Sequence, residues 1–323
     1  MFRISHNSST NLKNSIIKNN PSNIWVCFIM ELSDKLSEPI KMWNFHGDAV
    51  VGATTTHSEP QFLTVAKYGM GEFWVYKVKV DPGREIPTLE KHLIVSNSPL
   101  ASWRGEAISA QLWNEHQPRA QVGQISNDGD TLYYLANGQR SIGRVSLRDG
   151  EARVLRAINP QVGERCEYFL KLGKSPQIAT IENYQDCFLR IYHWDDDGLT
   201  MLGAERQLGG SLFYGLAQDN DNELMMVVPK QGNYPLKSNK EPGVYRVKLE
   251  GGTTDAPRQL QLSEPQKDPR FDAIELPSDI RGLAPVFHEG KVHGYFLTTY
   301  RATRDSLNGG EPSELFYTRV LNK

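Results

Sequence analysis

The chain has 323 residues, with 36 Lys and Arg against 38 Asp and Glu, so its formal net charge is −2. This balance excludes a basic nucleic-acid-binding protein, because no surplus of positive charge is available to neutralise phosphates. With 39% hydrophobic and 10% aromatic residues, the chain is too apolar to be disordered throughout. No apolar run reaches the length of about 18 residues that a membrane-spanning helix needs, so we expect no membrane partner.

The first 29 residues differ in composition from the rest. They are rich in Asn and Ser, and no acidic residue occurs before Glu31. We expect residues 1–29 to be a disordered leader, or an extension ahead of a start at Met30, and residues 30–323 to form a single domain. The short apolar run Ile24–Met30 would also suit a strand, so this boundary is open.

Cysteine usage predicts a reducing compartment. The three cysteines, Cys27, Cys166 and Cys187, show no close spacing. They therefore predict neither a disulfide framework nor a zinc site of the CxxC type. We expect buried free thiols and a cytoplasmic protein.

A six-residue pattern, apolar–any–basic–apolar–any–apolar, recurs strictly or nearly so along the chain. The runs are Val75–Val80, Ile142–Leu147, Phe188–His193, Val244–Leu249 and Tyr317–Asn322. Their basic residues are Lys77, Arg144, Arg190, Arg246 and Arg319. The runs are rich in β-branched and aromatic residues and roughly alternating, which predicts strands. The alternation places each basic side chain among partly exposed residues, beside an apolar row.

Two further strand-like runs precede each basic run. The pairs are Ala49–Thr55 with Phe62–Lys67, Val122–Ser126 with Thr131–Ala136, Tyr168–Leu172 with Gln177–Ile181, Tyr214–Gln218 with Glu223–Val228, and Leu283–Phe287 with Val292–Thr299. Turn sequences such as Asp128-Gly129 lie between them and favour hairpins. A fourth run follows in several repeats, as at Glu90–Val95, Ala152–Ala157, Leu199–Gly203 and Arg258–Leu262.

A repeated unit of four antiparallel strands predicts an all-β protein, a β-propeller of about five four-stranded blades. The last unit lacks a fourth strand, and Pro39–Phe45 could supply it. The ring would then be closed by strands from the N- and C-terminal parts of the chain. Six blades is the alternative, because Ser96–Gln121 is unassigned and could form a helix or an extra strand pair.

Two stretches carry a resemblance to known propellers. Asn127–Leu135 followed by Ile142–Leu147 resembles blades of the SMP-30/gluconolactonase and NHL type. Gly215–Leu224 is similar to the "GLA-x-D-x-x-G-x-L" blade opening of the same proteins. The resemblance implies a propeller fold over most of residues 40–323.

The resemblance also implies a place for a metal. Gluconolactonase-type enzymes hold a divalent metal on an acidic residue at the opening of the first blade, near which Asp48 stands here. Tyr214 and Arg281 stand at the openings of two later blades, and neither is a metal ligand of that family.

In a propeller the first strand of each blade lines the central channel, and ligands commonly sit at its mouth. The openings in this chain supply His46, Asp48, Gln121, Glu167, Tyr214 and Arg281. Such a set predicts a polar binding site. The alternative is that these charges pair with one another and fill a narrow channel.

The segment that breaks the repeat supplies three further candidates. Trp103 and Trp113 flank Glu106 there. Insertions in repeat folds often lie on a binding face, and an exposed Trp beside polar groups is typical of a sugar site. We therefore include these three residues as candidate ligand contacts.

These observations favour a binding module that holds a small molecule, glycan or protein partner at the channel mouth. The alternative is a propeller hydrolase, lactonase or lyase, with Asp48 and Glu167 as base and acid and Arg281 as an electrostatic clamp. The sequence requires no cofactor. A divalent cation, Ca²⁺ or Zn²⁺, belongs to the enzymatic alternative, with His46 and Asp48 as candidate ligands.

Overall fold

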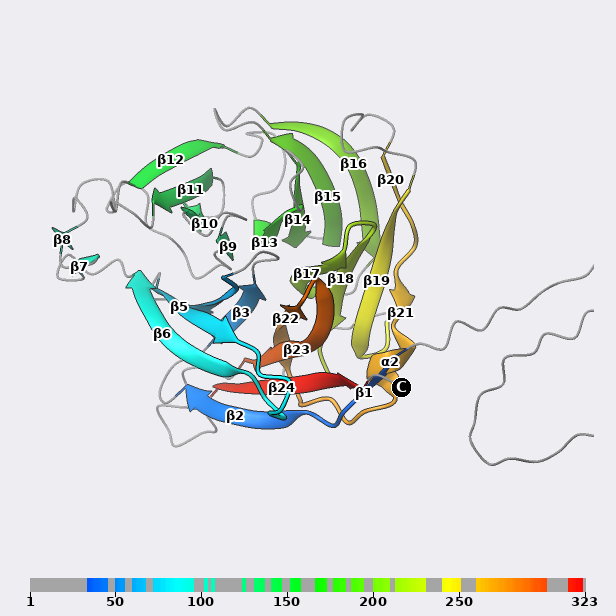
Figure 1. The fold of residues 1–323 in the computed structure, drawn as a ribbon. Coiled ribbons are helices and arrows are strands. Elements are labelled where there is room, and N and C mark those ends of the chain that lie inside the picture. Colours follow the sequence, from blue (N-terminus) through cyan, green and yellow to red (C-terminus); the bar gives the residue numbers. More distant parts are fainter. Residues whose placement is uncertain are drawn as a thin grey trace, which may run out of the picture.

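The computed structural model shows sheets arranged in a ring, which is a β-propeller arrangement (Figure 1). It describes residues 34–45, 50–55, 60–67, 72–95, 102–103, 106–107, 124–125, 131–136, 141–146, 152–157, 166–172, 177–183, 187–194, 200–209, 213–230, 240–250, 260–300 and 313–321. These residues are nearly all β, as the sequence predicted. The proposed leader, residues 1–29, lies outside the described residues. No helix in the described ranges is long and apolar enough to cross a membrane.

The sheets follow one another along the chain, and in each the first strand is hydrogen-bonded to the second and the second to the third. One comprises β3 (Val50–Thr55), β4 (Phe62–Lys67), β5 (Glu72–Lys79) and β6 (Thr88–Val95). The next comprises β9 (Gln124–Ile125), β10 (Thr131–Ala136), β11 (Ser141–Ser146) and β12 (Ala152–Ala157). It is followed by β13 (Cys166–Lys171), β14 (Gln177–Asn183), β15 (Cys187–Trp194) and β16 (Thr200–Gly209).

The remaining sheets have a divided outer edge. One comprises β17 (Tyr214–Asn220), β18 (Glu223–Val228), β19 (Gly243–Glu250), β20 (Gln261–Leu262) and β21 (Gln266–Lys267). The other comprises β22 (Ile280–His288), β23 (Lys291–Thr299), β24 (Ser313–Leu321), β1 (Lys35–Leu36) and β2 (Ile40–Phe45). A short helix, α2 (Pro269–Asp272), lies between them in sequence.

The structure gives the sequence repeat a position in the fold. Every basic run lies on the third strand of its sheet, namely on β5, β11, β15, β19 and β24. The predicted hairpins are present as well. Between β22 and β23 the two turn residues Glu289 and Gly290 have φ of 51° and 74°, as the twist of a tight hairpin requires.

Strands from the two ends of the described chain share a sheet. Strand β2 pairs with β24 in antiparallel register from Ile40 opposite Tyr317 to Phe45 opposite Ser313. This confirms that the segment Pro39–Phe45 supplies an outer strand beside the C-terminal one. In the unassigned segment Ser96–Gln121, the described residues form a strand pair, β7 (Ser102–Trp103) with β8 (Glu106–Ala107).

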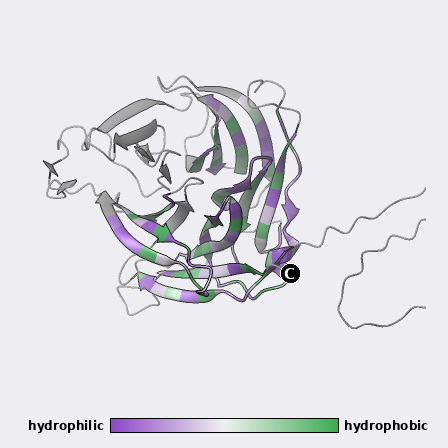
Figure 2. Cartoon of the chain, viewed as in Figure 1, coloured by the Kyte–Doolittle hydropathy of each residue, from purple (hydrophilic) through white to green (hydrophobic). Residues whose placement is uncertain are grey.

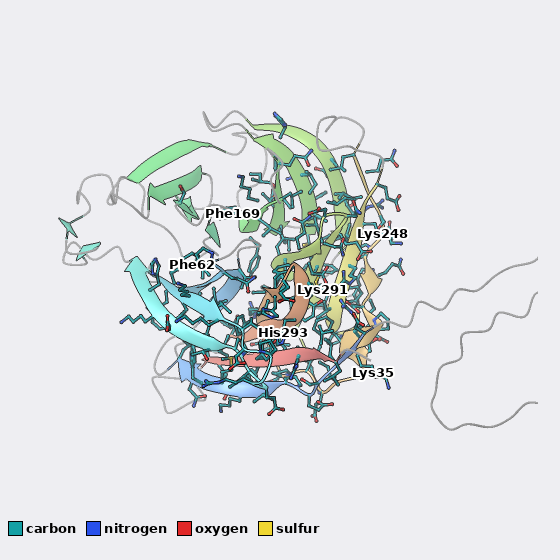
Figure 3. All side chains as sticks on the ribbon, viewed as in Figure 1. Lys35, Phe62, Phe169, Lys248, Lys291 and His293 are labelled. Atoms are coloured by element: carbon teal, nitrogen blue, oxygen red, sulfur yellow. The ribbon has the colours of Figure 1, made fainter. Side chains whose placement is uncertain are left out.

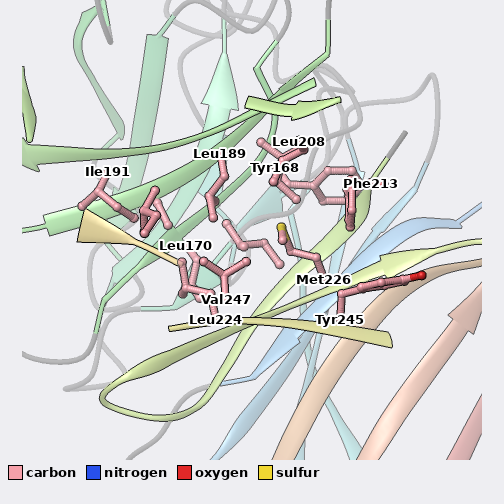
Figure 4. Packing of buried hydrophobic residues seen from close by; sticks show 14 of the residues in the cluster. Tyr168, Leu170, Leu189, Ile191, Leu208, Phe213, Leu224, Met226, Tyr245 and Val247 are labelled. Carbon is pink, nitrogen blue, oxygen red and sulfur yellow. The ribbon is translucent and has the colours of Figure 1, made fainter. Parts of the chain in front are cut away.

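Apolar side chains hold neighbouring sheets face to face. One cluster of buried residues joins the β13–β16 sheet to the β17–β20 sheet and includes Leu189, Phe213 and Met226 (Figure 4). A second joins the β17–β20 sheet to the β22–β24 sheet, and a third joins the latter to the β3–β6 sheet. Burial of these faces is the main force that keeps the ring together.

Hydrophobic and hydrophilic residues are mixed along each strand but differ in how deeply their side chains are buried. Figure 2 shows hydrophobic and hydrophilic positions interspersed along the strands. In Figure 3, Lys35 and Lys248 lie at the outer edge, whereas Phe169 lies nearer the centre of the ring. Phe169 is 2% exposed, and both lysines are exposed. This sorting is what alternating strands predict.

The third-strand arginines are tied to carboxylates on both sides. Arg190 on β15 pairs with Glu182 on β14 and Glu205 on β16. Arg246 on β19 pairs with Asp219 on β17, with Glu223 on β18 at 2.7 Å and with Asp268 at 2.6 Å. The two arginine side chains are only 12% and 16% exposed. They are thus more covered than alternation alone predicted, because the acidic side chains lie over them.

The network around Arg246 reaches the next sheet. Tyr295 on β23 donates its hydroxyl to Asp219 at 2.7 Å, and Arg270 in α2 binds Asp268 at 2.8 Å. Burial alone would raise the pKa of Asp219, but Arg246, Tyr295 and Arg270 outweigh it and hold that pKa below its ordinary value. Asp268, also buried, has its pKa lowered by Arg270 and Arg246. Both groups are therefore carboxylates at neutral pH.

We expect Asp219→Asn to lower the free energy of unfolding at pH 7 by about 3–5 kcal/mol, because it leaves Arg246 buried beside a neutral partner. A carboxylate with a depressed pKa stabilises the fold above its ordinary pKa of about 3.9, and that contribution is lost as the pH falls through the lower folded value. The deficit of the variant should therefore shrink below about pH 4. Urea unfolding at a series of pH values from neutral to acid measures the difference in free energy of unfolding between the variant and the unaltered protein.

Glu90→Gln is the matched control. Glu90 binds Lys79 at 2.6 Å, and both side chains are about half exposed, so its removal should leave the unfolding curve unchanged. Equal losses in the two variants, or a deficit for Asp219→Asn that does not depend on pH, would contradict the role given to the buried network.

Candidate functional site

The site is built where three innermost strands begin. Strands β13, β17 and β22 are each the first of their sheet, and Figure 1 shows β17 and β22 near the centre of the ring. Strand β22 lies against β17 on one side and against β3 on the other, and β17 also lies against β13. Residues at the start of these strands are thereby brought together from distant parts of the chain.

Arg281 is the centre of this cluster. Its guanidinium carbon Cζ lies 3.9 Å from the ring centroid of Tyr214 and 4.6 Å from that of Tyr300. Tyr214 is the first residue of β17, and Tyr300 directly follows β23. A guanidinium over a tyrosine face is attracted by the negative face of the ring, and more strongly when water is partly excluded. The Arg281 side chain is 16% exposed and Tyr214 is 8% exposed.

Asp279 fixes the remaining edge of the guanidinium. The Nε atom of Arg281 donates to Oδ1 of Asp279 at 3.3 Å. Asp279 has φ of 59°, in the left-handed region that costs energy for a residue with a Cβ atom, although Asp tolerates it better than most. Its carbonyl oxygen accepts a hydrogen bond from the amide of Tyr300 at 2.9 Å. The same residue therefore positions both Arg281 and one of its aromatic neighbours.

A third sheet contributes Tyr168 from β13. Its ring meets that of Tyr214 edge to face, with centroids 6.1 Å apart and an interplanar angle of 89°. Burial by itself would lower the pKa of Arg281, but Tyr214, Tyr168 and Asp279 outweigh it, so the pKa lies above its ordinary value. Arg281 is consequently a permanent cation. We call Tyr168, Tyr214, Asp279, Arg281 and Tyr300 the arginine–tyrosine cluster.

The cluster accounts for part of the predicted site. Tyr214 and Arg281, named from the sequence, are in contact. Glu167 belongs to β13, next to Tyr168 in sequence, and only its main-chain position is described. Four others, His46, Asp48, Trp113 and Gln121, lie outside the described residues.

The structure separates Trp103 and Glu106 from this cluster. The two residues oppose each other in the β7–β8 pair. Figure 1 shows that pair at the outer edge of the ring, away from β17 and β22. Only the main-chain positions of these two candidates are described, so their part in a ligand site stays a prediction.

Sequence reasoning missed three members of the cluster. Tyr168 was assigned to a strand, and neither Tyr300 nor Asp279 was named as a site residue. Asp279 stands two residues before Arg281, a spacing at which an acidic turn residue can reach an arginine, and this signal was available. For Tyr168 the sequence offers no signal, because its contact depends on how separate sheets pack. Tyr300 is placed by the register of β22 with β23 within one sheet.

Known proteins offer little further guidance. No family model and no curated protein matches this chain. Among solved structures, a 6-phosphogluconolactonase-like protein from Bacteroides uniformis is 10% identical over 68% of this chain and 55% of that one, with a TM-score of 0.38. This chain thus spans about half the length of that protein.

Two other solved structures cover more of the chain. The nidogen/laminin complex is 11% identical over 77% of this chain and 72% of that one, with a TM-score of 0.39. A luciferin-regenerating enzyme is 13% identical over 88% and 96%, with a TM-score of 0.42. The sequence identities and TM-scores are too low for the function of any of these proteins to be assigned to this chain. The ring of sheets by itself makes the chain a β-propeller-like protein, with an arginine–tyrosine cluster where its innermost strands begin.

Gly215 allows the strands that carry the cluster to meet. It has φ of +58°, and a Cβ atom there would lie 3.0 Å from the carbonyl oxygen of Arg281 and 3.3 Å from the amide nitrogen of Leu283. Because both neighbours are main-chain atoms, they cannot move aside without shifting β22. We expect Gly215→Ala to lower the free energy of unfolding by about 2–4 kcal/mol, from crowding added to backbone strain. Urea unfolding measures this loss.

Gly209→Ala separates the two contributions. Gly209 has φ of +79°, but a Cβ atom there would meet nothing within 4 Å. This variant should lose only about 1 kcal/mol, from the positive φ. If both variants lose the same amount, the close approach of β17 to β22 does not matter to stability.

Proposed function

We propose that this protein is a binding module, a closed propeller of five blades related to the SMP-30 or NHL type, which holds a ligand at the mouth of its central channel. The observation that supports it is the arginine–tyrosine cluster. It gathers a cation and three phenol rings from separate sheets at the ends where innermost strands begin. Such a mixture of apolar surface and a few fixed polar groups is typical of ligand sites.

The ligand is a small molecule, a glycan or a segment of a protein partner, and neither nucleic acid nor a membrane. The near-neutral net charge supports the exclusion of nucleic acid. We infer a cytoplasmic location from the cysteines, of which Cys187 is buried. Tyrosine suits all three ligand classes, since its ring packs against apolar groups and sugar faces while its hydroxyl forms hydrogen bonds.

The enzymatic alternative is a hydrolase, lactonase or lyase. Its support is the main-chain position of Glu167 on β13, next in sequence to Tyr168 of the arginine–tyrosine cluster. In this alternative Glu167 and Asp48 exchange protons with the substrate and Arg281 stabilises developing negative charge. A divalent cation, Ca²⁺ or Zn²⁺, would be held by His46 and Asp48.

We expect at least one of three probes of similar size, namely benzoate, benzylammonium and benzyl alcohol, to shift the Arg281 Nε–H signal saturably in an NMR titration. The signal is assigned by its loss in Arg281→Lys. Tyr214→Leu should weaken binding of that probe about tenfold, because it removes the ring that lies closest to the guanidinium.

Tyr76→Leu makes the same change outside the cluster, where Tyr76 packs against Trp43. It should leave binding unchanged. The proposal fails if none of the three probes perturbs Arg281, or if Tyr76→Leu weakens binding as much as Tyr214→Leu.

Thermal unfolding distinguishes the binding module from the metal-dependent alternative. A cation bound by the native state alone raises the melting temperature, and EDTA reverses the rise. The binding-module proposal expects the same melting temperature in EDTA and in excess Ca²⁺ or Zn²⁺. A cation-dependent rise that disappears in Asp48→Asn would favour the enzyme instead.

A further inference from the structure

The guanidinium of Arg281 presents one occupied edge and one open edge. An arginine carries five N–H donors in a fixed planar fork. The Nε–H is used by Asp279, and no acceptor for the two terminal nitrogens is found among the described residues. Neither terminal nitrogen is among the buried side-chain atoms that lack a partner in the described part of the chain, so this edge is open to water and to an acceptor on a ligand.

The open edge is held in one orientation. Asp279 fixes Nε, and the rings of Tyr214 and Tyr300 lie at 3.9 Å and 4.6 Å from Cζ. The left-handed backbone of Asp279 is the kind of local strain that gathers at binding sites. A side chain that is already ordered loses little further entropy when it binds, so this arrangement is pre-organised.

From this geometry we infer that the ligand of the proposed binding module carries a carboxylate, which the two terminal nitrogens of Arg281 bind side by side. The inference rests on the proposed function. A carboxylate matches the planar fork with two parallel charge-assisted hydrogen bonds, and these are strongest where water is partly excluded. One guanidinium carries a single positive charge, which a singly charged carboxylate balances and a phosphate dianion exceeds.

The phenol rings define the rest of the ligand. The rings of Tyr214 and Tyr300 lie against the guanidinium, so a ligand that reaches the terminal nitrogens of Arg281 comes close to aromatic rings. An apolar or aromatic body attached to the carboxylate would pack against them. We therefore choose benzoate as the probe, and benzamide as its neutral counterpart of the same shape.

Ligand-observed NMR titrations of the full-length protein with benzoate, benzamide and inorganic phosphate test the inference. Benzoate should bind with a Kd of about 1–10 mM, the range expected for so small a ligand. Benzamide and phosphate should bind at least tenfold more weakly. Arg281→Gln should weaken benzoate at least tenfold, and Arg281→Lys, which keeps the charge but not the fork, should weaken it severalfold.

Three results would overturn the inference: benzamide or phosphate binding as tightly as benzoate, Arg281→Gln leaving benzoate binding unchanged, or benzoate failing to bind. If Arg281→Gln does not fold, the comparison of benzoate with benzamide on the unaltered protein still decides. The proposed function has a separate test. Benzylammonium or benzyl alcohol binding at Arg281, with benzoate excluded, would refute the carboxylate and leave the binding module standing.

Discussion

The close approach of the innermost strands is the constraint on which the rest of the structure depends. Gly215 on β17 lies against the main chain of Arg281 and Leu283 on β22, and Thr55 on β3 donates its hydroxyl to the carbonyl of Pro285 on β22. These contacts leave little room for side chains between neighbouring strands. Residues at the strand ends are consequently the ones that can face a shared opening, which is where the arginine–tyrosine cluster lies.

A second constraint acts within the sheets. The third-strand arginines join carboxylates of the strands on either side, as Arg190 does through Glu182 and Glu205. Such ion pairs add less net stability than their number suggests, since each charge loses water on burial. Their stronger effect is on the register between neighbouring strands, because a strand shifted by one residue would leave a buried charge without a partner. At Arg190 and Arg246 the recurring basic residue thus has a structural role within its sheet.

The sequence was sufficient for the all-β, propeller-like arrangement and for two residues of the arginine–tyrosine cluster, whereas the five blades, the closure of the ring and the ligand site stay predictions. Alternation and turn residues located the strands, and the basic runs fell on the third strand of each sheet, because these signals depend on local chemistry. Tyr214 and Arg281 were found because they stand at the starts of first strands. Tyr168 was not found, since it comes from another sheet and its distance depends on packing, and Tyr300 was not found, since its place opposite Asp279 depends on the register of β22 with β23. Likewise, nothing local indicated that Arg246 would be covered by Asp268.

The pairing of β2 with β24 has a consequence for biosynthesis. Strand β2 is synthesised before its partner β24, and the strands of the other sheets lie between them in sequence. Until then the apolar face of β2, with Phe45 on it, has no sheet to join. Contacts between residues so far apart in sequence form slowly, and an unpaired strand is prone to aggregation while it waits. Cells that make this protein would therefore be expected to shield its early strands with a chaperone during translation.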